Sequence, residues 1–401
     1  MINHVQRENG QGELRFLVKS LKEKLSNFIE AMAMGHNYNY IHGNQFIYCT
    51  LIVVMLSFSF IGCSKKTASI PELKLSNVLS TNYTPVVYLS AEDGLAEKHG
   101  VVPKIEYNDG IEPLITGKVD GRLNNLVATL VSAGNGADIV LFAGTMGGGH
   151  MLFANKKVAG ELKNLDNWKG HSVGTRIQIT PQLVISSWLR DKFGEEGDAV
   201  FKYYDSDPAA ITACAKGEVD ITAVYYSQIE TAESQGLVPL FELVEIAPDY
   251  ACCRQTANGP KLRSDRNLFV AWTKGLIEAW KVYNTNHDEA IKVIKNVTRQ
   301  DEQWVYNHIY DKKLTANITF NPDPYYNGVL GQYDVCVNKG YINKEKARAL
   351  PDYFDISVYA DALREIIKEN PDDKFYRDMW KYFVTHNDAY PNFERDYKKE
   401  I

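Results

Sequence analysis

The chain has 401 residues, a formal net charge of -6 and no run of basic residues interleaved with aromatic ones. This balance argues against nucleic acid as a partner. With 45% hydrophobic and 23% charged residues, the composition is that of a globular protein with a substantial core.

The N-terminal region contains an uncharged apolar run that begins at Phe46 and ends in Gly62-Cys63. A hydrophobic segment followed by a small residue and a cysteine is typical of a bacterial lipoprotein signal. We therefore expect residues 1–62 to be a signal peptide and Cys63 to carry the lipid. Residues 63–71 would then tether the protein to the extracytoplasmic face of the cell membrane.

Two alternatives stay open for this region. Some 45 polar residues precede the run, so the apolar segment is either an uncleaved N-terminal anchor or a signal whose start is misassigned. A start at Met34 would give a signal of ordinary length, but without Lys or Arg ahead of the apolar run. Each alternative exports the rest of the chain.

Four cysteines follow the lipidation site, namely Cys214, Cys252, Cys253 and Cys336. They are too few for a disulfide scaffold, and their spacing fits no zinc site, so we expect no metal and no cofactor. Adjacent residues of a strand face opposite sides. We therefore expect one thiol of the Cys252–Cys253 pair to be buried and the other to face elsewhere, without a disulfide between them.

The first part of the chain mixes strands and helices. Alternation and capping signals predict strands at Leu73–Leu79, Val101–Tyr107 and Asp138–Ala143, a helix from Pro85 to Gly100, and a helix at Asn125–Ala133. A glycine-rich stretch, Gly144 to His150, follows the third strand and precedes the apolar segment Met151–Ala154. It lacks the Gly-Lys-Ser/Thr ending of a phosphate loop, so it is either a ligand contact or a flexible crossover.

From Asn164 the chain alternates strands and helices with short connections, which predicts a parallel sheet covered by helices. Thr180 before Pro181 and Asp207 before Pro208 predict two helix starts, and Gly194 and Gly217 predict the ends. Further elements are expected at Phe201–Tyr204 (strand), Val219–Tyr225 (strand), Ser227–Gln235 (helix) and Leu240–Ala247 (strand).

Beyond Thr256 the pattern predicts helix after helix. Ser264 is expected to cap a long helix that carries Leu268 and Trp280. Further helices are expected at Asp288–Asn296, Asp301–Asp311, Asn343–Ala349, Val358–Asn370 and Asp373–Val384.

Two motifs in the middle of the chain resemble those of a known family. Lys169-Gly170-His171-Ser172-Val173-Gly174 resembles the "L-K-G-K-x-V-G" element of type II solute-binding proteins, and Gly217-Glu218-Val219-Asp220-Ile221 resembles their "G-x-V-D-A" element. The order of elements over about Leu73 to Val297 is similar to the nitrate/sulfonate/taurine and thiamine-pyrimidine branch of ABC-transporter substrate-binding proteins.

The resemblance implies an α/β, two-lobe type II periplasmic binding protein fold with two crossing strands and a helical C-terminal region. Residues 72–155 with 256–401 would form lobe 1, and residues 156–255 would form lobe 2. The implied function is capture of a small organic solute (sulfonate-, nitrate- or pyrimidine-like) by a monomer that delivers it to an ABC permease in the membrane, without catalysis.

Ligands of open α/β sheets bind at the carboxyl ends of strands and at helix N-termini. This rule predicts ligand-binding residues in four loops and on the second crossing: Asn82, Tyr83, Thr84, Thr145, Met146, Gly147, Arg176, Gln178, Thr180, Tyr225, Tyr226 and Arg254. Tyr225 and Tyr226 point opposite ways on a strand, so at most one faces the cleft. Arg176 is either a ligand contact or a solvated charge, and Arg254 binds either an acidic residue or an anionic ligand.

Two other functions remain open at this stage. Pyrimidine-forming enzymes of the same branch carry the motif "C-C-C-F-C", but Cys252-Cys253-Arg254-Gln255-Thr256 matches only its first two positions. No Cys or Ser stands in a recognisable arrangement with His and a carboxylate, as nucleophilic catalysis would require. The third reading is a domain that presents bound ligand to a membrane receptor.

Overall fold

The computed structural model describes residues 69–77, 84–108, 110–123, 125–194, 199–248 and 250–398. Nearly all of them belong to one compact unit, Ile70–Ile401. The apolar run, Cys63 and the site candidates Asn82 and Tyr83 lie outside the described residues. Within the described part of the chain, no helix combines the length and the apolar character needed to cross a bilayer.

The first lobe is built on a five-stranded sheet in the order β2-β1-β3-β10-β4. Its strands are β1 (Glu72–Asn77), β2 (Val102–Tyr107), β3 (Gly121–Arg122), β4 (Ile139–Gly147) and β10 (Ala251–Asn258). β1 is parallel to β2 and β3, whereas β10 runs antiparallel to β3 and β4.

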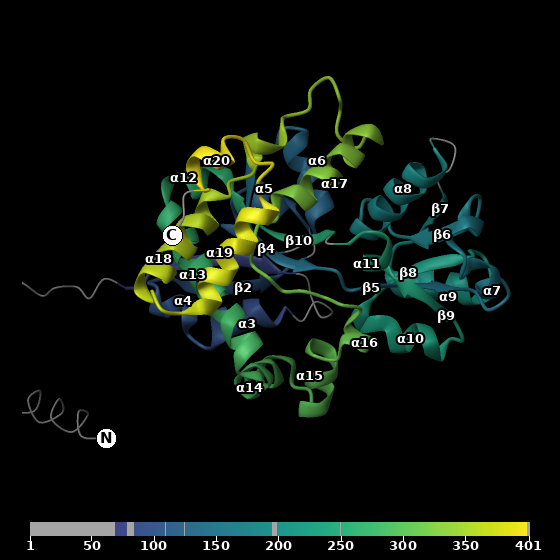
Figure 1. The fold of residues 1–401 in the computed structure, drawn as a ribbon, viewed down its shortest axis with the longest axis horizontal. Coiled ribbons are helices and arrows are strands. Elements are labelled where there is room, and N and C mark those ends of the chain that lie inside the picture. The colour runs from purple at the N-terminus through teal and green to yellow at the C-terminus, as the bar shows by residue number, and fades with distance from the viewer. Residues whose placement is uncertain are drawn as a thin grey trace, which may run out of the picture. The chain divides into compact units, whose positions relative to one another are not determined.

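The helices outside the second lobe come from both ends of the described chain, and several of them cover this sheet (Figure 1). They are α3 (Pro85–Glu92), α4 (Leu95–Lys98), α5 (Glu112–Ile115), α6 (Leu126–Gly134), α12 (Gly259–Ser264), α13 (Arg266–Thr285), α14 (His287–Thr298), α15 (Glu302–Ile309), α16 (Lys312–Thr315), α17 (Tyr326–Asn338), the 3₁₀ helix Leu350–Tyr353, α18 (Ser357–Glu369), α19 (Lys374–His386) and α20 (Phe393–Asp396). The long helix α13 buries Phe269, Trp272 and Leu276 on one face, and it packs against α3, α4 and α18. The indole of Trp272 donates to Gln255 Oε1 at 3.1 Å, which fixes α13 onto β10.

The second lobe has its own five-stranded sheet, ordered β7-β6-β8-β5-β9. Its elements are β5 (His150–Ala154), α7 (Ala159–Leu162), a 3₁₀ turn (Leu165–Trp168), β6 (Ser172–Thr175), α8 (Thr180–Phe193), β7 (Val200–Tyr203), α9 (Asp207–Lys216), β8 (Ile221–Tyr225), a 3₁₀ turn (Tyr226–Gln228), α10 (Ile229–Ser234), β9 (Val238–Glu242) and α11 (Leu243–Ile246). β6 is parallel to β7 and β8, and β5 is antiparallel to β8 and β9. The predicted α/β fold with two lobes, crossing strands and C-terminal helices is confirmed.

The chain passes between the sheets at two places. It leaves the first sheet after β4 through Gly148 and Gly149, whose φ angles of +69° and +84° favour glycine. The chain returns to the first sheet between the end of α11 and the start of β10. These crossings lie a few residues from the lobe boundaries expected after residues 155 and 255, and those boundaries stay a prediction.

A third segment, residues 316–324, runs beside β4 at the crossing. Thr319 and Gly147 exchange two backbone hydrogen bonds of 2.9 Å, and Gly144 donates to the carbonyl of Pro322 at 2.7 Å. These partners extend β4 to Gly147, so the prediction of a glycine-rich loop from Gly144 to His150 is wrong for most of that stretch. The glycines instead permit close backbone packing.

Three predicted elements need correction. The helix expected from Pro85 to Gly100 divides into α3 and α4 at Gly94, which takes φ +71°. The strand expected to Ala247 ends at Glu242, where Glu242 and Glu245 form a capping box that starts α11. Ser264 ends α12 instead of capping the long helix, which begins at Arg266.

No helix forms at residues 343–349, and the sequence reading missed α17. This helix begins after Tyr325, which adopts the left-handed region with φ +54°, and it contains two glycines of low helix propensity. Its packing against α6 and α8 is tertiary and leaves no clear periodic signal.

Gly144 offers a test of the close packing at the crossing. A Cβ atom there would lie 2.3 Å from the Asp323 carbonyl oxygen and 2.5 Å from that of Asn321. We expect Gly144→Ala to lower the free energy of unfolding by about 3 kcal/mol, because backbone must shift to relieve the clash. Urea denaturation would measure this change.

Gly160→Ala is the matched control, since a Cβ atom at Gly160 would meet no atom within 4 Å. Alanine is also the better helix former, so this variant should be neutral or slightly stabilising. Equal effects of the two substitutions would contradict the packing argument.

Candidate functional site

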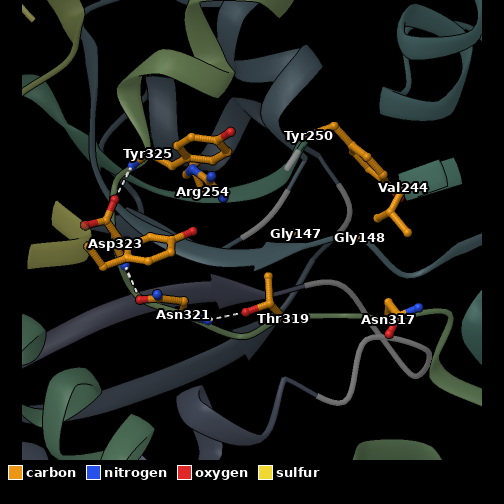
Figure 2. Close-up of a pocket in the computed structure, with 11 residues that line it drawn as sticks. Gly147, Gly148, Val244, Tyr250, Arg254, Asn317, Thr319, Asn321, Asp323 and Tyr325 are labelled. Atoms are coloured by element: carbon orange, nitrogen blue, oxygen red, sulfur yellow. Dashed lines mark hydrogen bonds between the residues drawn. The ribbon is translucent and has the colours of Figure 1, made fainter. Parts of the chain in front are cut away.

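A pocket lies where the two crossings and the third segment meet. Its cavity volume is about 70 Å³, enough for several waters or part of a small solute. It is lined by residues of β4, β10, α11, α19 and the loop before α17: Gly147, Gly148, Val244, Tyr250, Arg254, Asn317, Thr319, Asn321, Asp323, Tyr325 and Tyr382 (Figure 2). We call it the hinge pocket.

Arg254 supplies the positive charge of the hinge pocket. Only 3% of the residue is exposed. Its Nε donates to the Pro324 carbonyl at 2.7 Å, and Nη1 donates to the carbonyls of Cys253 and Met146 at 2.7 and 3.0 Å. The Tyr325 ring lies over the guanidinium at 5.8 Å. The predicted ion pair with an acidic residue is not found among the described residues, where the partners of Arg254 are backbone carbonyls, which bring no neutralising charge. Contact with an anionic ligand stays a prediction.

Asp323 supplies the negative charge. One carboxylate oxygen, Oδ1, accepts from the Tyr325 backbone N–H at 2.8 Å and from Asn387 Nδ2 at 2.9 Å. The other, Oδ2, is buried without a hydrogen-bond partner among the described residues. Burial raises the pKa of Asp323 to about 6, against the opposing effect of these hydrogen bonds, His386 and Arg254.

The loop that carries Asp323 is folded by short-range hydrogen bonds. Thr319 Oγ1 accepts from Asn321 N, and Asn321 Oδ1 accepts from Asp323 N at 3.0 Å (Figure 2). Prolines at 322 and 324 flank the aspartate and restrict its backbone. The sequence Asn321-Pro322-Asp323-Pro324 was the available signal for this turn, and the sequence reading did not use it.

A second group of buried side chains lies at the lobe junction, next to the hinge pocket. His150 Nδ1 and the Tyr250 hydroxyl are 2.7 Å apart, and the Tyr225 hydroxyl donates to Met146 Sδ at 2.8 Å. The rings of His150 and Tyr225 meet edge to face at 5.3 Å. Burial lowers the pKa of His150 to about 3, so its imidazole is neutral at physiological pH.

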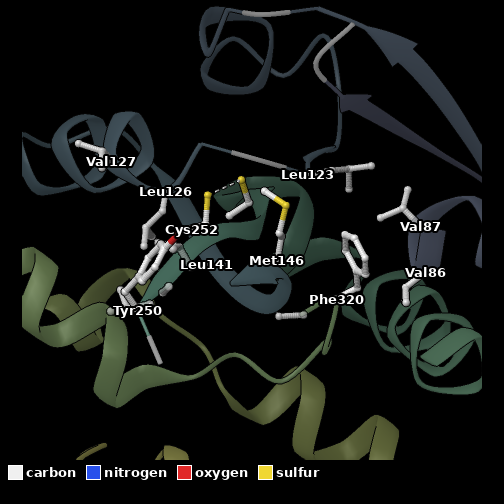
Figure 3. Packing of buried hydrophobic residues seen from close by; sticks show 14 of the residues in the cluster. Val86, Val87, Leu123, Leu126, Val127, Leu141, Met146, Tyr250, Cys252 and Phe320 are labelled. Atoms are coloured by element: carbon white, nitrogen blue, oxygen red, sulfur yellow. Dashed lines mark hydrogen bonds between the residues drawn. The ribbon is translucent and has the colours of Figure 1, made fainter. Parts of the chain in front are cut away.

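The two adjacent thiols also lie at this junction (Figure 3). Both are buried and their sulfurs are 3.6 Å apart, so the prediction that one would face elsewhere is wrong. The cause is an irregularity in the β10–β4 register on either side of Cys253, which turns neighbouring side chains to one side. Hydrogen bonding between them lowers the pKa of Cys253 and raises that of Cys252.

The predicted site residues occupy three kinds of position. Gly147 and Arg254 line the hinge pocket. Met146, Tyr225 and Tyr226 lie in the junction group, where the two tyrosine rings are 4.6 Å apart and both residues are buried. They do not point opposite ways as expected, because β8 ends at Tyr225 and a 3₁₀ turn begins at Tyr226.

Helix starts account for three other candidates. Thr180 is the first residue of α8 rather than its cap, and its hydroxyl donates to the Cys252 carbonyl at 3.3 Å. Ser206, not Asp207, caps α9, and Asp207 accepts from Arg176 at 2.9 Å. Arg176 is 46% exposed, so it forms a surface ion pair. Gln178 takes φ +56° in the turn before α8.

Buried polar oxygens without a described partner gather at strand ends in both lobes. Thr84 Oγ1 follows the β1 region and Thr145 Oγ1 lies on β4, while Thr175 Oγ1, Ser227 Oγ and Gln228 Oε1 follow β6 and β8. Buried polar groups are normally hydrogen-bonded, so these atoms are exceptions among the described residues. The hinge-pocket residues Asp323, Tyr325 and Tyr382 were not predicted, because they come from a segment far along the chain.

Comparisons with known proteins agree on the fold. No protein-family model matches the chain, and no curated protein matches it in sequence. Among solved structures, the aliphatic sulphonate binding protein SsuA of Escherichia coli aligns with 72% of this chain and 99% of its own at a TM-score of 0.57 and 14% identity. The nitrate-binding protein NrtA of Synechocystis PCC 6803 aligns over 74% and 89% at a TM-score of 0.57 and 12% identity.

The desulfurization enzyme DSZB shares the fold as well, with 74% of this chain and 99% of its own aligned at a TM-score of 0.51 and 13% identity. The chain therefore has the two-lobe fold of periplasmic binding proteins. At these identities the likeness establishes the fold and not the ligand.

The raised pKa of Asp323 predicts a pH-dependent stability. The folded value of about 6 lies above the unfolded value of about 3.9. The protonated Asp323 carboxyl therefore contributes to the free energy of unfolding in full below about pH 4. This contribution is lost as the pH rises through about 6. The free energy of unfolding of Asp323→Asn should therefore rise relative to that of the parent protein by about 2 to 3 kcal/mol as the pH goes from 4 to 7.

Urea denaturation of the ligand-free protein at several pH values would measure the difference. Asp166→Asn is the control, because Asp166 is 73% exposed and pairs with Lys192 at the surface. A stability difference for Asp323→Asn that does not change with pH would contradict the assignment.

Proposed function

We propose that this protein is the extracytoplasmic solute-binding component of an ABC importer. It would capture a small organic solute between its lobes, as a monomer, and deliver it to a permease in the membrane. The observation that carries this proposal is the hinge pocket, a cavity at the crossing of two α/β lobes that is lined by the buried charge of Arg254.

The unpartnered oxygens at the strand ends support an extended site. Thr84, Thr145, Thr175 and Ser227 stand where ligands of α/β sheets bind. Together with the hinge pocket they would offer hydrogen bonds from both lobes, so that a bound solute stabilises the closed arrangement. The solute class suggested by the fold neighbours is sulfonate, nitrate or a similar small molecule.

The crossings also suit lobe motion. Gly148 and Gly149 join the two sheets in left-handed backbone conformations, and hinge motions are absorbed by a few residues of this kind. The Thr180 hydroxyl of α8 in the second lobe donates a hydrogen bond to the Cys252 carbonyl of β10. A movement of α8 would therefore change this contact with β10.

Cys63 would anchor the protein by lipid outside the cytoplasmic membrane. Metabolic labelling with a radioactive fatty acid in a bacterial host should mark the parent protein. We expect Cys63→Ser to lose the label, whereas Cys214→Ser should retain it. A labelled Cys63→Ser protein would refute the anchoring site.

The solute itself is the most direct test of function. Purified full-length protein should release one small molecule per chain on denaturation, identified by mass spectrometry and checked by a native mass spectrum. Titration of that molecule into stripped protein should restore one-to-one binding by calorimetry. A protein that releases nothing and shows no thermal shift across a solute library would contradict the proposal.

An enzyme on the same fold is the second candidate, and the buried thiol pair of Cys252 and Cys253 is the observation that favours it. The same release experiment separates the two functions, because a transport protein returns its solute unchanged and an enzyme returns a chemically altered product.

A further inference from the structure

The turn that follows α17 reaches from the first lobe to the second. Gln182 Nε2 donates a hydrogen bond to the Tyr341 hydroxyl at 2.6 Å and another to the Tyr203 hydroxyl at 3.2 Å. The Lys339 ammonium lies over the Phe201 ring, 5.7 Å from its centroid. The turn belongs to the first lobe, whereas its partners belong to α8 and β7 of the second lobe. Side chains therefore join the two lobes in addition to the backbone crossings.

Tyr341 is fixed to the first lobe through its backbone. Its N–H donates to the Cys336 carbonyl of α17, and its carbonyl accepts from Asn135 Nδ2 at the end of α6, both at 2.9 Å. The next residue, Ile342, is fully buried. Because these contacts hold the turn on both sides, the Tyr341 ring moves with the first lobe.

Gln182 is the matching fixed point on the second lobe. It is fully buried, and its Oε1 accepts from the Gln178 backbone N–H at 2.8 Å. Gln178 lies in the turn that joins the carboxyl end of β6 to the start of α8, which is a position where ligands of α/β sheets bind. A single side-chain amide thus connects this turn of the second lobe with Tyr341 of the first.

The contact lies away from the strand that enters the second lobe. In the sheet order β7-β6-β8-β5-β9, β7 is three strands from β5, or about 14 Å at about 4.8 Å per strand. A rotation of the lobes about the crossings would therefore move β7 and its side chains by several times the roughly 0.5 Å that a hydrogen bond tolerates. The contact can form in only one arrangement of the lobes.

We propose that Tyr341 and Lys339 form an interlobe latch, which holds the lobes closed through Gln182 and Phe201 before any solute is bound. The inference rests on the proposed solute-binding function and adds a conformational device to it. Helices α8 and α17, which carry or precede these residues, pack against each other (Figure 1).

The strength of the contacts suits a latch that opens. Tyr203 is 47% exposed, so water can replace its partners when the lobes separate. A hydrogen bond exchanged for water and a cation over an aromatic ring near solvent each contribute modestly. A contact made in only one of two states shifts their populations by its own free energy. The latch would therefore bias the closed state without locking it.

Single-molecule fluorescence energy transfer on stripped full-length protein tests the latch. Fluorophores on non-natural amino acids would replace Glu233 of α10 and Lys368 of α18, which are exposed and lie on different lobes. The parent protein should show a closed and an open separation. Tyr341→Phe removes only the hydroxyl and should lower the closed-to-open ratio at least about 3-fold. Lys339→Gln should lower the ratio as well.

Tyr333→Phe is the matched control, because the Tyr333 hydroxyl donates to the Arg348 carbonyl at 3.0 Å within the first lobe. This variant should leave the ratio unchanged. Gln182→Met removes the amide at similar volume, and in that background Tyr341→Phe should have no further effect. Circular dichroism and melting temperature would establish that each variant is folded.

The outcomes separate the latch from the function on which it rests. If Tyr341→Phe keeps the parent ratio, or Tyr333→Phe lowers the ratio equally, the latch is overturned and solute binding stands. A parent protein with a single separation also overturns it, because no equilibrium would remain to be biased. If the protein neither releases nor binds any solute, the proposed function fails, whereas the measured ratios still decide whether the latch exists.

Discussion

The buried guanidinium of Arg254 forms hydrogen bonds with three segments that meet where the chain crosses between the lobes. Arg254 lies on β10 and donates to a carbonyl of β4, to a carbonyl of β10 itself and to a carbonyl of the loop before α17. Carbonyls satisfy its donors without cancelling its charge, and a buried arginine stays protonated. The site where the lobes join is therefore built around a positive charge that its own backbone partners do not neutralise.

Close backbone packing makes this arrangement sterically allowed. Gly144 and Gly148 let residues 316–324 lie close to β4 and the residue after it, where a Cβ atom would collide with the carbonyls of Asn321, Asp323 and Asn317. That segment also carries Asp323 and places its carboxylate in the hinge pocket beside Arg254. The glycines thus affect the hinge pocket indirectly, because they leave space for residues 316–324, which form part of its lining.

The lobe junction combines apolar burial with a few specific polar contacts. His150, Tyr250, Tyr225 and Met146 connect β5 and β8 of the second lobe to β4 and the start of β10 through two hydrogen bonds. The register irregularity in β10 adds both thiols to this group. Tyr250 belongs both to the hinge pocket and to this junction.

The sequence by itself determined the alternation of strands and helices and the helical C-terminal region, and it marked Arg254 as a costly charge beside an apolar strand. These follow from local patterns: apolar periodicity, capping residues and the cost of an arginine on an apolar strand. Tertiary structure decided the rest. Asp323 meets Arg254 only because the third segment returns to β4, the thiols face one side only because β10 is irregular, and Arg176 pairs at the surface with Asp207. Contacts between distant segments leave no periodic signal in a single sequence, so neither the position of Asp323 near Arg254 nor the pocket could be predicted from it.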